Sequence, residues 1–534
     1  MCENTNTPKS KADIHDQEHK KWNRRSFLQA LGLVGGGTMM LGGTPISASK
    51  ASPLAVALSQ AETDRILVLV RLKGGNDGLN TIVPLDQFDA YEALRPTLKH
   101  TANNLYSLSN NYAMPSYMTD LQSVWGNGAM KVVHGVGYQD ASLSHFSGSD
   151  IWASTDLADN TETGWFGRYF EGIYPDYLVN PPAIPAAIQI GSIGNLIFDG
   201  DNSNYAFSVA NPSQLESIAQ NGTLHEMTNL PGCTYGSQLE FMRGTTNTTF
   251  NYAQTINSAY NNSVNSVNYE DAGLGRQLAN VARMIKGNLG TKIYMVTLDG
   301  FDTHANQADG HQSLLMNLSN SIKLFFDDLA VSGHDQEVLA MTISEFGRRP
   351  DENGSKGTDH GAASPLLLFG PGLENNGFVG NHPSLTTLDP NGNLVYNVDF
   401  REIYATVMQE WLCINSSVVN QALLGQNMNT VDLGFNCASL SVDEFDIANG
   451  FAHFVLMDNN DTIIKIKNPN TQHVDIKLYD ILGKEVTTLK NEMLFPGEYS
   501  INVKNETSTR LNTGQYIYRI SIGDQHYSKS IIIR

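Results

Sequence analysis

Four short apolar runs in this chain are each followed by side chains that can bind a metal ion or attack an ester. They lead into Asp77, into the pair Ser144 and His145, into Asp299 and into Glu345. The runs cover residues 65–72, 131–138, 292–298 and 338–343. Continuous apolar runs of this length suit strands buried on both faces of a parallel sheet. Because the carboxyl ends of parallel strands meet at one edge, these carboxylates and imidazoles would collect there, as a cluster of divalent cations requires.

The third and fourth runs are joined by a segment with helical spacing. Residues 308–330 place apolar side chains at intervals of three and four, and Gly333 stops the pattern. This predicts a strand-helix-strand unit whose two strands are parallel neighbours. Asp302 and His304 are two residues apart at the end of the first strand, so they can point the same way. Glu345 would then lie beside them at the end of the second strand.

A further ligand-type pair, Asp359 and His360, is flanked by glycines just before the apolar run 365–369. A loop of this kind can carry one more ligand into a crevice. A single Asp-His pair is more often a structural hydrogen bond than a metal site. The convergence of several such residues at predicted strand ends favours a metal site.

The first 50 residues have the features of an export signal. Arg24 and Arg25 follow a charged start and precede a weakly apolar, glycine-rich run over 30–43, as in twin-arginine signals. This run is too short to span a bilayer. We therefore expect residues 1–50 to be a signal and processing region read by the twin-arginine translocase, and we expect no transmembrane span in the mature chain.

Composition limits the class of partner. The chain has 54 acidic and 34 basic residues, a formal net charge of −20. This excess argues against nucleic acid or an anionic membrane as the main partner. Of the four cysteines, Cys2 lies in the predicted signal, and the odd number that remains implies no disulfide framework.

The C-terminal part has a different pattern. From about residue 463, apolar residues alternate with a period of two between short turns. Repeated short strands of this kind predict a small β-sandwich over 461–534. We therefore expect one large core over 62–435 and a linker over 436–460.

Several segments of the predicted β-sandwich carry a family resemblance. They are Asn468-Pro469, residues 478–486, residues 511–516 and the basic end, residues 528–534. Together they resemble the C-terminal sorting domain of type nine secretion cargo in Bacteroidetes. A carbohydrate-binding or immunoglobulin-like module shares the strand pattern alone. The resemblance implies handling by the type nine secretion system and a place at the cell surface or outside the cell.

Five motifs of the core carry a second resemblance. They are Gly74-Gly75-Asn76-Asp77-Gly78-Leu79-Asn80-Thr81, Ser144-His145-Phe146, Phe301-Asp302-Thr303-His304, Ser344-Glu345-Phe346-Gly347-Arg348 and Thr358-Asp359-His360-Gly361. They resemble a large uncharacterised family of exported bacterial proteins, domain of unknown function fifteen-oh-one. That family is similar to a remote branch of the alkaline phosphatase and sulfatase superfamily, whose members hydrolyse phosphate or sulfate esters with clustered divalent metals. The resemblance implies an α/β fold, with an alkaline-phosphatase-like core of mostly parallel sheet flanked by helices.

The superfamily pattern also implies roles for single residues. The implied metal ligands are Asp77 on the first strand, Asp299 for an accessory cation, Asp302, His304 and His360 for one metal with Asp359 in the same motif, and Glu345 for a second metal. Phe346 follows Glu345 where phosphatases have histidine, which departs from the pattern of the second site. The nucleophile position falls near His145, leaving Ser144 or Ser147 as candidates. A sulfatase-type cysteine signature is absent from the sequence.

Ester hydrolysis requires an activated nucleophile and positive charge over the developing oxyanion, and divalent metals supply both. Arg348 or Arg349 could clamp the anion. Alternatively, these arginines pair with Asp351 and Glu352 at the surface. The predicted catalytic group is therefore Ser144, His145 and Arg348, with zinc or manganese as the expected metal. Two functions fit: a secreted or surface-attached metal-dependent hydrolase of phosphate or related anionic esters, and a non-catalytic surface protein that uses the fold as a binding platform.

Overall fold

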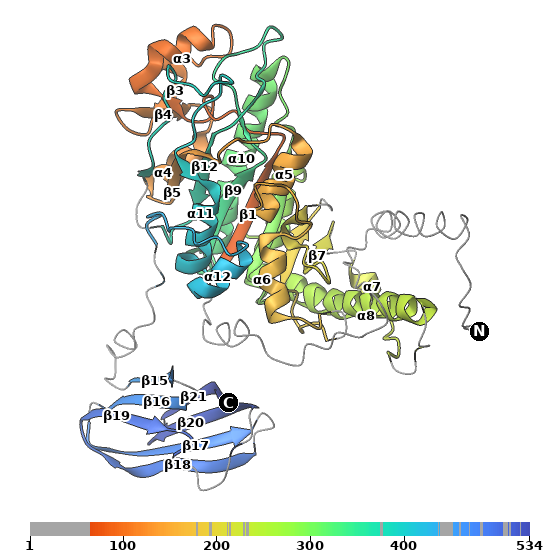
Figure 1. Cartoon of the computed structure of the whole chain (residues 1–534), viewed down its shortest axis with the longest axis vertical. Helices are drawn as coiled ribbons and strands as arrows, with labels where there is room; N and C mark the ends of the chain where they lie inside the picture. Colours follow the sequence, from red (N-terminus) through yellow and green to blue (C-terminus); the bar gives the residue numbers. More distant parts are fainter. Residues whose placement is uncertain are drawn as a thin grey trace. The chain divides into compact units, whose positions relative to one another are not determined.

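The chain forms two compact units, one up to Asn436 and one from Cys437 onward. A computed structural model describes residues 65–533 except 178–179, 192–194, 211, 213–214, 228–229, 231–233, 374–376, 436, 438–451, 459–460, 469, 481–483, 506–510, 512–513 and 524. The predicted twin-arginine signal lies outside the described residues. The two units are therefore considered separately, the first as the core and the second as the C-terminal unit (Figure 1).

Strands in the described part of the core form one large sheet in the order β13-β5-β12-β9-β1-β8-β6-β7, with β14 paired to β5. Their bounds are β1 Ile66–Lys73, β5 Met130–Gly137, β6 Ala187–Ile190, β7 Ala206–Val209, β8 Ile293–Asp299, β9 Val338–Ser344, β12 Ser364–Phe369, β13 Gly377–Val379 and β14 Val398–Asp399. β12 runs antiparallel to both neighbours. The other pairs are parallel. The expectation of a mostly parallel sheet is confirmed.

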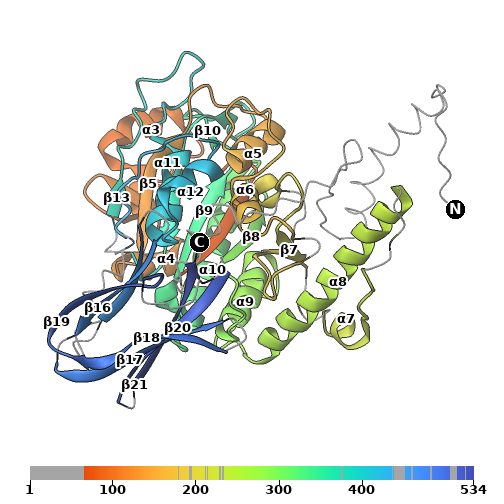
Figure 2. The same cartoon turned by 60° about the horizontal axis from the view of Figure 1, so that its bottom comes forward.

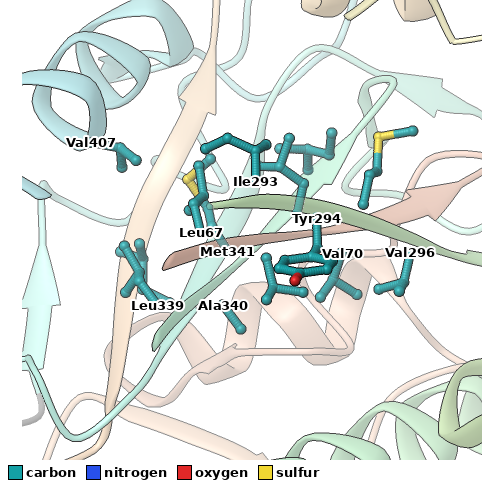
Figure 3. Close-up of a cluster of buried hydrophobic side chains, with 14 of the residues drawn as sticks. Leu67, Val70, Ile293, Tyr294, Val296, Leu339, Ala340, Met341 and Val407 are labelled. Atoms are coloured by element: carbon teal, nitrogen blue, oxygen red, sulfur yellow. The ribbon is translucent and has the colours of Figure 1, made fainter. Parts of the chain in front are cut away.

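β1 is the central strand of the three that end nearest the predicted site. Leu67 pairs with Ile293 of β8 on one side and with Leu339 of β9 on the other. Figure 3 shows these side chains within the buried apolar cluster. Leu67 and Val70 are both fully buried, and their spacing puts them on opposite faces of the strand. Burial on both faces explains why β1 is a nearly continuous apolar run.

The strand-helix-strand prediction is correct in its elements but wrong about adjacency. β8, α10 (Gln307–Ala330) and β9 follow one another along the chain. The strands are parallel, but β1 lies between them. A helix of 24 residues is long enough to carry the crossover past one strand, and the sequence does not show how many strands a crossover passes.

Helices cover both faces of the sheet (Figure 1). On one face α10 contacts α4 (Thr119–Gly126) and α9 (Gly273–Lys286). A second group of helices contains α5 (His145–Ser154), α6 (Trp165–Ile173), α11 (Phe400–Thr406) and α12 (Ser416–Ala422). The π-helix η6 (Val407–Trp411) continues α11. Among the described residues, no helix combines the length and apolar character that a bilayer crossing requires.

Smaller elements complete the core. α3 covers Phe88–Leu94, and a three-stranded sheet joins β2 (Val83–Pro84), β4 (Tyr112–Pro115) and β3 (Leu105–Ser107). The helices α7 (Leu215–Asn221) and α8 (Thr234–Asn261) lie side by side, and α8 packs against α9 and β7 (Figure 2). Cys413 and Cys437 are each disulfide-bonded. The cysteine count implied no disulfide framework, but an odd number of cysteines still allows some of them to pair.

The C-terminal unit consists of two antiparallel sheets with the strand orders β15-β16-β19 and β18-β17-β20-β21. Their bounds are β15 Ala452–Asp458, β16 Asp461–Asn468, β17 Gln472–Asp480, β18 Glu485–Leu494, β19 Gly497–Asn502, β20 Gly514–Ile522 and β21 Gln525–Ile533. Alternate residues of both sheets, such as Ile464 and Ile476, share one buried apolar cluster. The sheets therefore pack face to face, as the period of two predicted.

Candidate metal centre

The candidate site lies where the parallel strands end. Lys73 at the end of β1 pairs with Asp299 of β8, and Leu72 pairs with Ser344 of β9. The three following loops therefore leave the sheet at one edge. β5 runs in the same direction because two antiparallel steps separate it from β9, and its end leads to α5. β12 runs the opposite way, so the segment before it also reaches this edge.

Two tight contacts bring the loops together. Arg348 of β10 (Gly347–Arg348) pairs with His360 of β11 (His360–Gly361). Gly74 has a φ of 115°, and a side chain on it would collide with the backbone at Asp302. Glycine is therefore required for the first loop to lie this close to the third.

Four side chains converge at this edge. The Nε2 atom of His145 lies 3.3 Å from Oδ2 of Asp302. The Nε2 atoms of His304 and His360 lie 3.1 and 3.2 Å from Oδ1 of the same carboxylate. Those two Nε2 atoms are 2.9 Å from each other. The possible ligand atoms of His145, Asp302 and His360 all lie within 4.8 Å of one another.

Each of the three imidazoles has its other nitrogen against an oxygen. Nδ1 of His145 lies 2.7 Å from Oε2 of Glu345. Nδ1 of His304 lies 3.1 Å from Oδ1 of Asp359. Nδ1 of His360 lies 2.7 Å from the carbonyl oxygen of Leu143. Because ionised carboxylates and carbonyls only accept hydrogen bonds, we assign the proton to Nδ1 in each ring, which leaves the Nε2 lone pair facing Asp302.

This arrangement fits a divalent cation. Three lone pairs aimed at one carboxylate repel each other unless a positive charge lies among them. Imidazoles that bind metals commonly donate the other N–H to a carboxylate or backbone carbonyl, which is the pattern of these three rings. Imidazole nitrogen and carboxylate oxygen are both ligands of zinc. The donor set therefore fits a metal ion, without fixing which one.

The electrostatics of the cluster favour the ligand forms of its members. Burial by itself raises the pKa of Asp302, but the hydrogen bond and the positive charge of Arg348 oppose this effect, and the pKa falls to about 2. Burial lowers the pKa of His360. At neutral pH the carboxylate is therefore charged and the His360 ring neutral, as metal binding requires. The side chain of Asp302 is 48% exposed, so a ligand can reach the cluster.

Three predicted metal ligands lie against basic side chains. Asp77 is fully buried, and its two oxygens accept hydrogen bonds from Arg95 at 2.6 and 3.1 Å. Burial raises the pKa of Asp77, but the Arg95 charge and hydrogen bond hold it well below the usual range. Asp299 accepts a hydrogen bond from Lys73 at 2.7 Å, in an exposed pair. The structure does not bring Asp77 or Asp299 into the cluster.

Glu345 is the third of these carboxylates. Its Oε1 accepts a hydrogen bond from Arg71 at 3.0 Å, while Oε2 faces His145. Asp359 likewise touches the cluster through a histidine, His304, and a hydrogen bond from Asn353 lowers its pKa. Glu345 and Asp359 therefore contact the Nδ1 atoms of two imidazoles, whereas the Nε2 atoms of the same rings face Asp302.

Arg348 is buried rather than open to a ligand. Its guanidinium donates to the carbonyls of Gly75, Thr358 and Phe301 at 2.8 to 2.9 Å and to the carbonyl of Gly74. It also donates to Asp302 at 2.9 Å. Both sequence interpretations, an anion clamp and a surface pair with acidic residues, differ from this position. Arg348 joins three loops and orients Asp302.

The segment before α5 supplies two of the predicted residues. Ser144 is exposed, and at the N-cap position its side chain makes no capping hydrogen bond. His145 is the first residue of the helix. Ser147, the other serine candidate, is half-buried.

Several residues around the cluster were not singled out by sequence reasoning. Gln307, at the start of α10, accepts hydrogen bonds from Thr303 at 3.0 Å and from Thr358 at 2.6 Å. It thereby joins the two loops that carry His304 and His360. The carbonyl of Leu143 has no sequence signal, since every residue has one. Arg71 is a single charge within an apolar run, and that is a usable signal.

Two family models match separate parts of the chain. Residues 217–435 match the family described as protein of unknown function DUF1501. The matched residues include Asp302, His304 and His360, and the match begins after His145. Residues 459–534 match the secretion system C-terminal sorting domain. This tail implies handling by the type nine system and indicates export to the cell surface or the extracellular space.

Some solved structures show a faint likeness to this chain. Lipoteichoic acid synthase LtaP from Listeria monocytogenes is 10% identical, over 79% of this chain and 85% of that chain, with a TM-score of 0.31. An alkaline phosphatase superfamily protein from Vibrio parahaemolyticus is 9% identical, over 88% and 92%, with a TM-score of 0.29. At these scores the likenesses decide nothing about its chemistry. No curated protein matches the chain in sequence.

Proposed function

We propose that this exported protein is a metal-dependent hydrolase of phosphate or related anionic esters. The observation that carries the proposal is the convergence of three Nε2 atoms on Asp302, each from a ring whose Nδ1 is held by an oxygen. The sorting tail supports a place of action at the cell surface or outside the cell.

The proposed ligands are His145, Asp302, His304 and His360. Three imidazoles with one carboxylate favour zinc or manganese over calcium, which prefers oxygen ligands. The other predicted ligands support one cation rather than several. Asp77 and Asp299 form ion pairs with Arg95 and Lys73 outside the cluster. Glu345 contacts His145 at Nδ1, not at the Nε2 atom that faces Asp302.

A bound divalent cation would polarise an ester oxygen and offset the charge that develops on it. The chain's own residues would do the rest. Ser144 is the proposed nucleophile, because its hydroxyl is exposed next to His145 and is not used for capping. The N-terminus of α5, a ten-residue helix, has backbone N–H groups without intrahelical partners, which favour an anionic group nearby. Arg348 would hold Asp302 in position through its hydrogen bond to the carboxylate.

Two observations favour the alternative, a non-catalytic surface protein. The guanidinium of Arg348 donates to four carbonyls and to Asp302, so it is not available to clamp an anionic ester. A second cation set is also not assembled among the described residues. A metal-loaded protein that binds an anionic ligand without turning it over would fit these features.

The test begins with the full chain purified without chelator. Elemental analysis should find close to one zinc or manganese per chain, and the protein should hydrolyse an aryl phosphate or phosphodiester. Asp302→Ala and His360→Ala should lose both the metal and the activity. Asp299→Asn is the matched control and should keep both, because the structure places it in an exposed pair with Lys73. A metal-loaded wild type that is inert towards a broad panel of phosphate and sulfate esters would favour the platform.

A further inference from the structure

The carboxylate of Glu345 lies between the guanidinium of Arg71 and the imidazole of His145, a candidate metal ligand. Its side chain is 4% exposed. One oxygen, Oε1, accepts a hydrogen bond from Arg71 at 3.0 Å. The other, Oε2, lies 2.7 Å from Nδ1 of His145. Arg71 is itself buried, and it also donates to the hydroxyl of Ser149 on α5 at 3.1 Å.

We propose that Glu345 is a positioning residue that, together with Arg71, sets the tautomer of His145, and that it is not itself a metal ligand. This inference rests on the proposed metal centre. Arg71 takes one carboxylate oxygen and balances its charge, so the second oxygen is free to accept from Nδ1. The proton of the neutral ring is thereby held on Nδ1, and Nε2 keeps the lone pair that faces Asp302.

Asp359 has the same relation to His304 but a different geometry. A single oxygen, Oδ1, faces Nδ1 of His304 at 3.1 Å and accepts from Asn353 at 3.0 Å. Its side chain is 53% exposed. Both donors therefore share one acceptor atom. Glu345, in contrast, offers a different oxygen to each donor.

This difference predicts opposite responses to an amide. In Glu345→Gln, Arg71 can only donate, so it retains the amide oxygen and turns the NH₂ group towards His145. An NH₂ group requires a lone pair on Nδ1, so the ring must carry its proton on Nε2 and can no longer bind a cation there. In Asp359→Asn, the one amide oxygen can still accept from both donors. The two substitutions change the same atom type and the same charge.

The experiment measures zinc affinity of the full chain by competition with a chromophoric chelator. Glu345→Gln should weaken zinc binding by about 100-fold, which is the upper end of the effect expected when a residue that hydrogen-bonds a metal ligand is replaced. Asp359→Asn should weaken it at least tenfold less than that. Arg71→Met combined with Glu345→Gln should recover at least tenfold, because the amide oxygen is then free to turn to Nδ1. Equal losses in the two amide variants, or no recovery in the double variant, would overturn the inference.

A second measurement reads the tautomer directly in metal-free protein. Long-range ¹H–¹⁵N spectra of ¹⁵N-histidine-labelled chain, with the ring assigned by its loss in His145→Ala, should show the proton on Nδ1 in wild type and on Nε2 in Glu345→Gln. A wild-type proton on Nε2 would overturn the inference even if the variants do not fold. A wild type that binds no metal but has the expected tautomer would instead count against the proposed function alone.

Discussion

The Nε2 atoms of His304 and His360 face each other at 2.9 Å, although the residues are 56 positions apart in the chain. The Nδ1 atoms of both rings are held by oxygens. Two lone pairs at this distance repel, and a cation relieves the repulsion. We therefore expect a metal ion bound at this contact to stabilise the core.

We expect zinc at 100 times its Kd to stabilise the core by about 2.7 kcal/mol, because a ligand that binds only the folded state shifts the unfolding equilibrium. His304→Ala and His360→Ala should each lose most of this gain. His225→Ala, at an exposed position, is the control. Tryptophan fluorescence during urea unfolding measures the effect in the core, because no tryptophan follows Trp411. A gain that survives both histidine variants would contradict the ligand set.

Asp77→Asn should destabilise the core by about 3–5 kcal/mol, because it leaves the guanidinium of Arg95 buried without its counter-charge. Both side chains of the pair are fully buried. Asp299→Asn breaks an exposed pair and should cost no more than about 1 kcal/mol. Urea unfolding compares the two variants. If Asp77→Asn instead lost the metal at unchanged stability, Asp77 would be a ligand after all.

Stability should fall as pH decreases below about 6.5, partly because of His134. Burial, with a smaller contribution from the His382 charge, lowers the pKa of His134 to about 3. The folded state therefore binds fewer protons than the unfolded state between about pH 6.5 and 3. The neutral ring stabilises the fold fully above this window, and the contribution is lost as pH falls through it.

His134→Phe should reduce the pH dependence in this window by up to about 1.4 kcal/mol per pH unit, which corresponds to one proton. Unfolding of chelator-treated protein at pH 7.5 and 5 tests this. His225→Phe should keep the wild-type slope. An unchanged slope in His134→Phe would show that His134 takes up no proton on unfolding. The His134→Phe variant should still show some pH dependence, because His311 is also buried and its pKa is lowered to about 4.

Ser144→Ala should reduce turnover of an aryl phosphate by at least about 100-fold while metal content stays at the wild-type level, because the variant removes the nucleophile and no ligand. Ser147→Ala is the matched control on the next turn of the same segment. Metal analysis and initial rates on the same samples separate the two effects. The reverse pattern would assign the nucleophile to Ser147.

Deletion of residues 452–534, which include all described strands of the C-terminal unit, should leave a folded core that no longer reaches the cell surface. The C-terminal unit has its own buried apolar cluster, so its removal should shift the unfolding temperature of the core by no more than about 2 °C. Fractionation of a host with a type nine system should find the truncated core in the periplasm. A reporter fused to the tail should be exported. Surface delivery of the truncated core would contradict the assignment.

The sequence by itself determined the elements and the edge at which chemistry can occur. β1, β8 and β9 are apolar because they are buried on both faces, and that pattern is local. The C-terminal sheets follow from alternation with a period of two, which is also local. Asp302 and His304 are recognisable because ligand-type residues follow an apolar strand, and His360 because a glycine-flanked Asp-His pair precedes one.

Only the tertiary structure decided which carboxylates are available. Asp77, Asp299 and Glu345 have the same sequence setting as Asp302, at the end of a strand. Asp302 differs because its two oxygens face three imidazole Nε2 atoms. A basic neighbour alone does not decide the role, because Arg348 donates to Asp302 as well. The groups that a carboxylate faces are set by strand order and loop packing between residues up to 274 positions apart, and local sequence specifies neither.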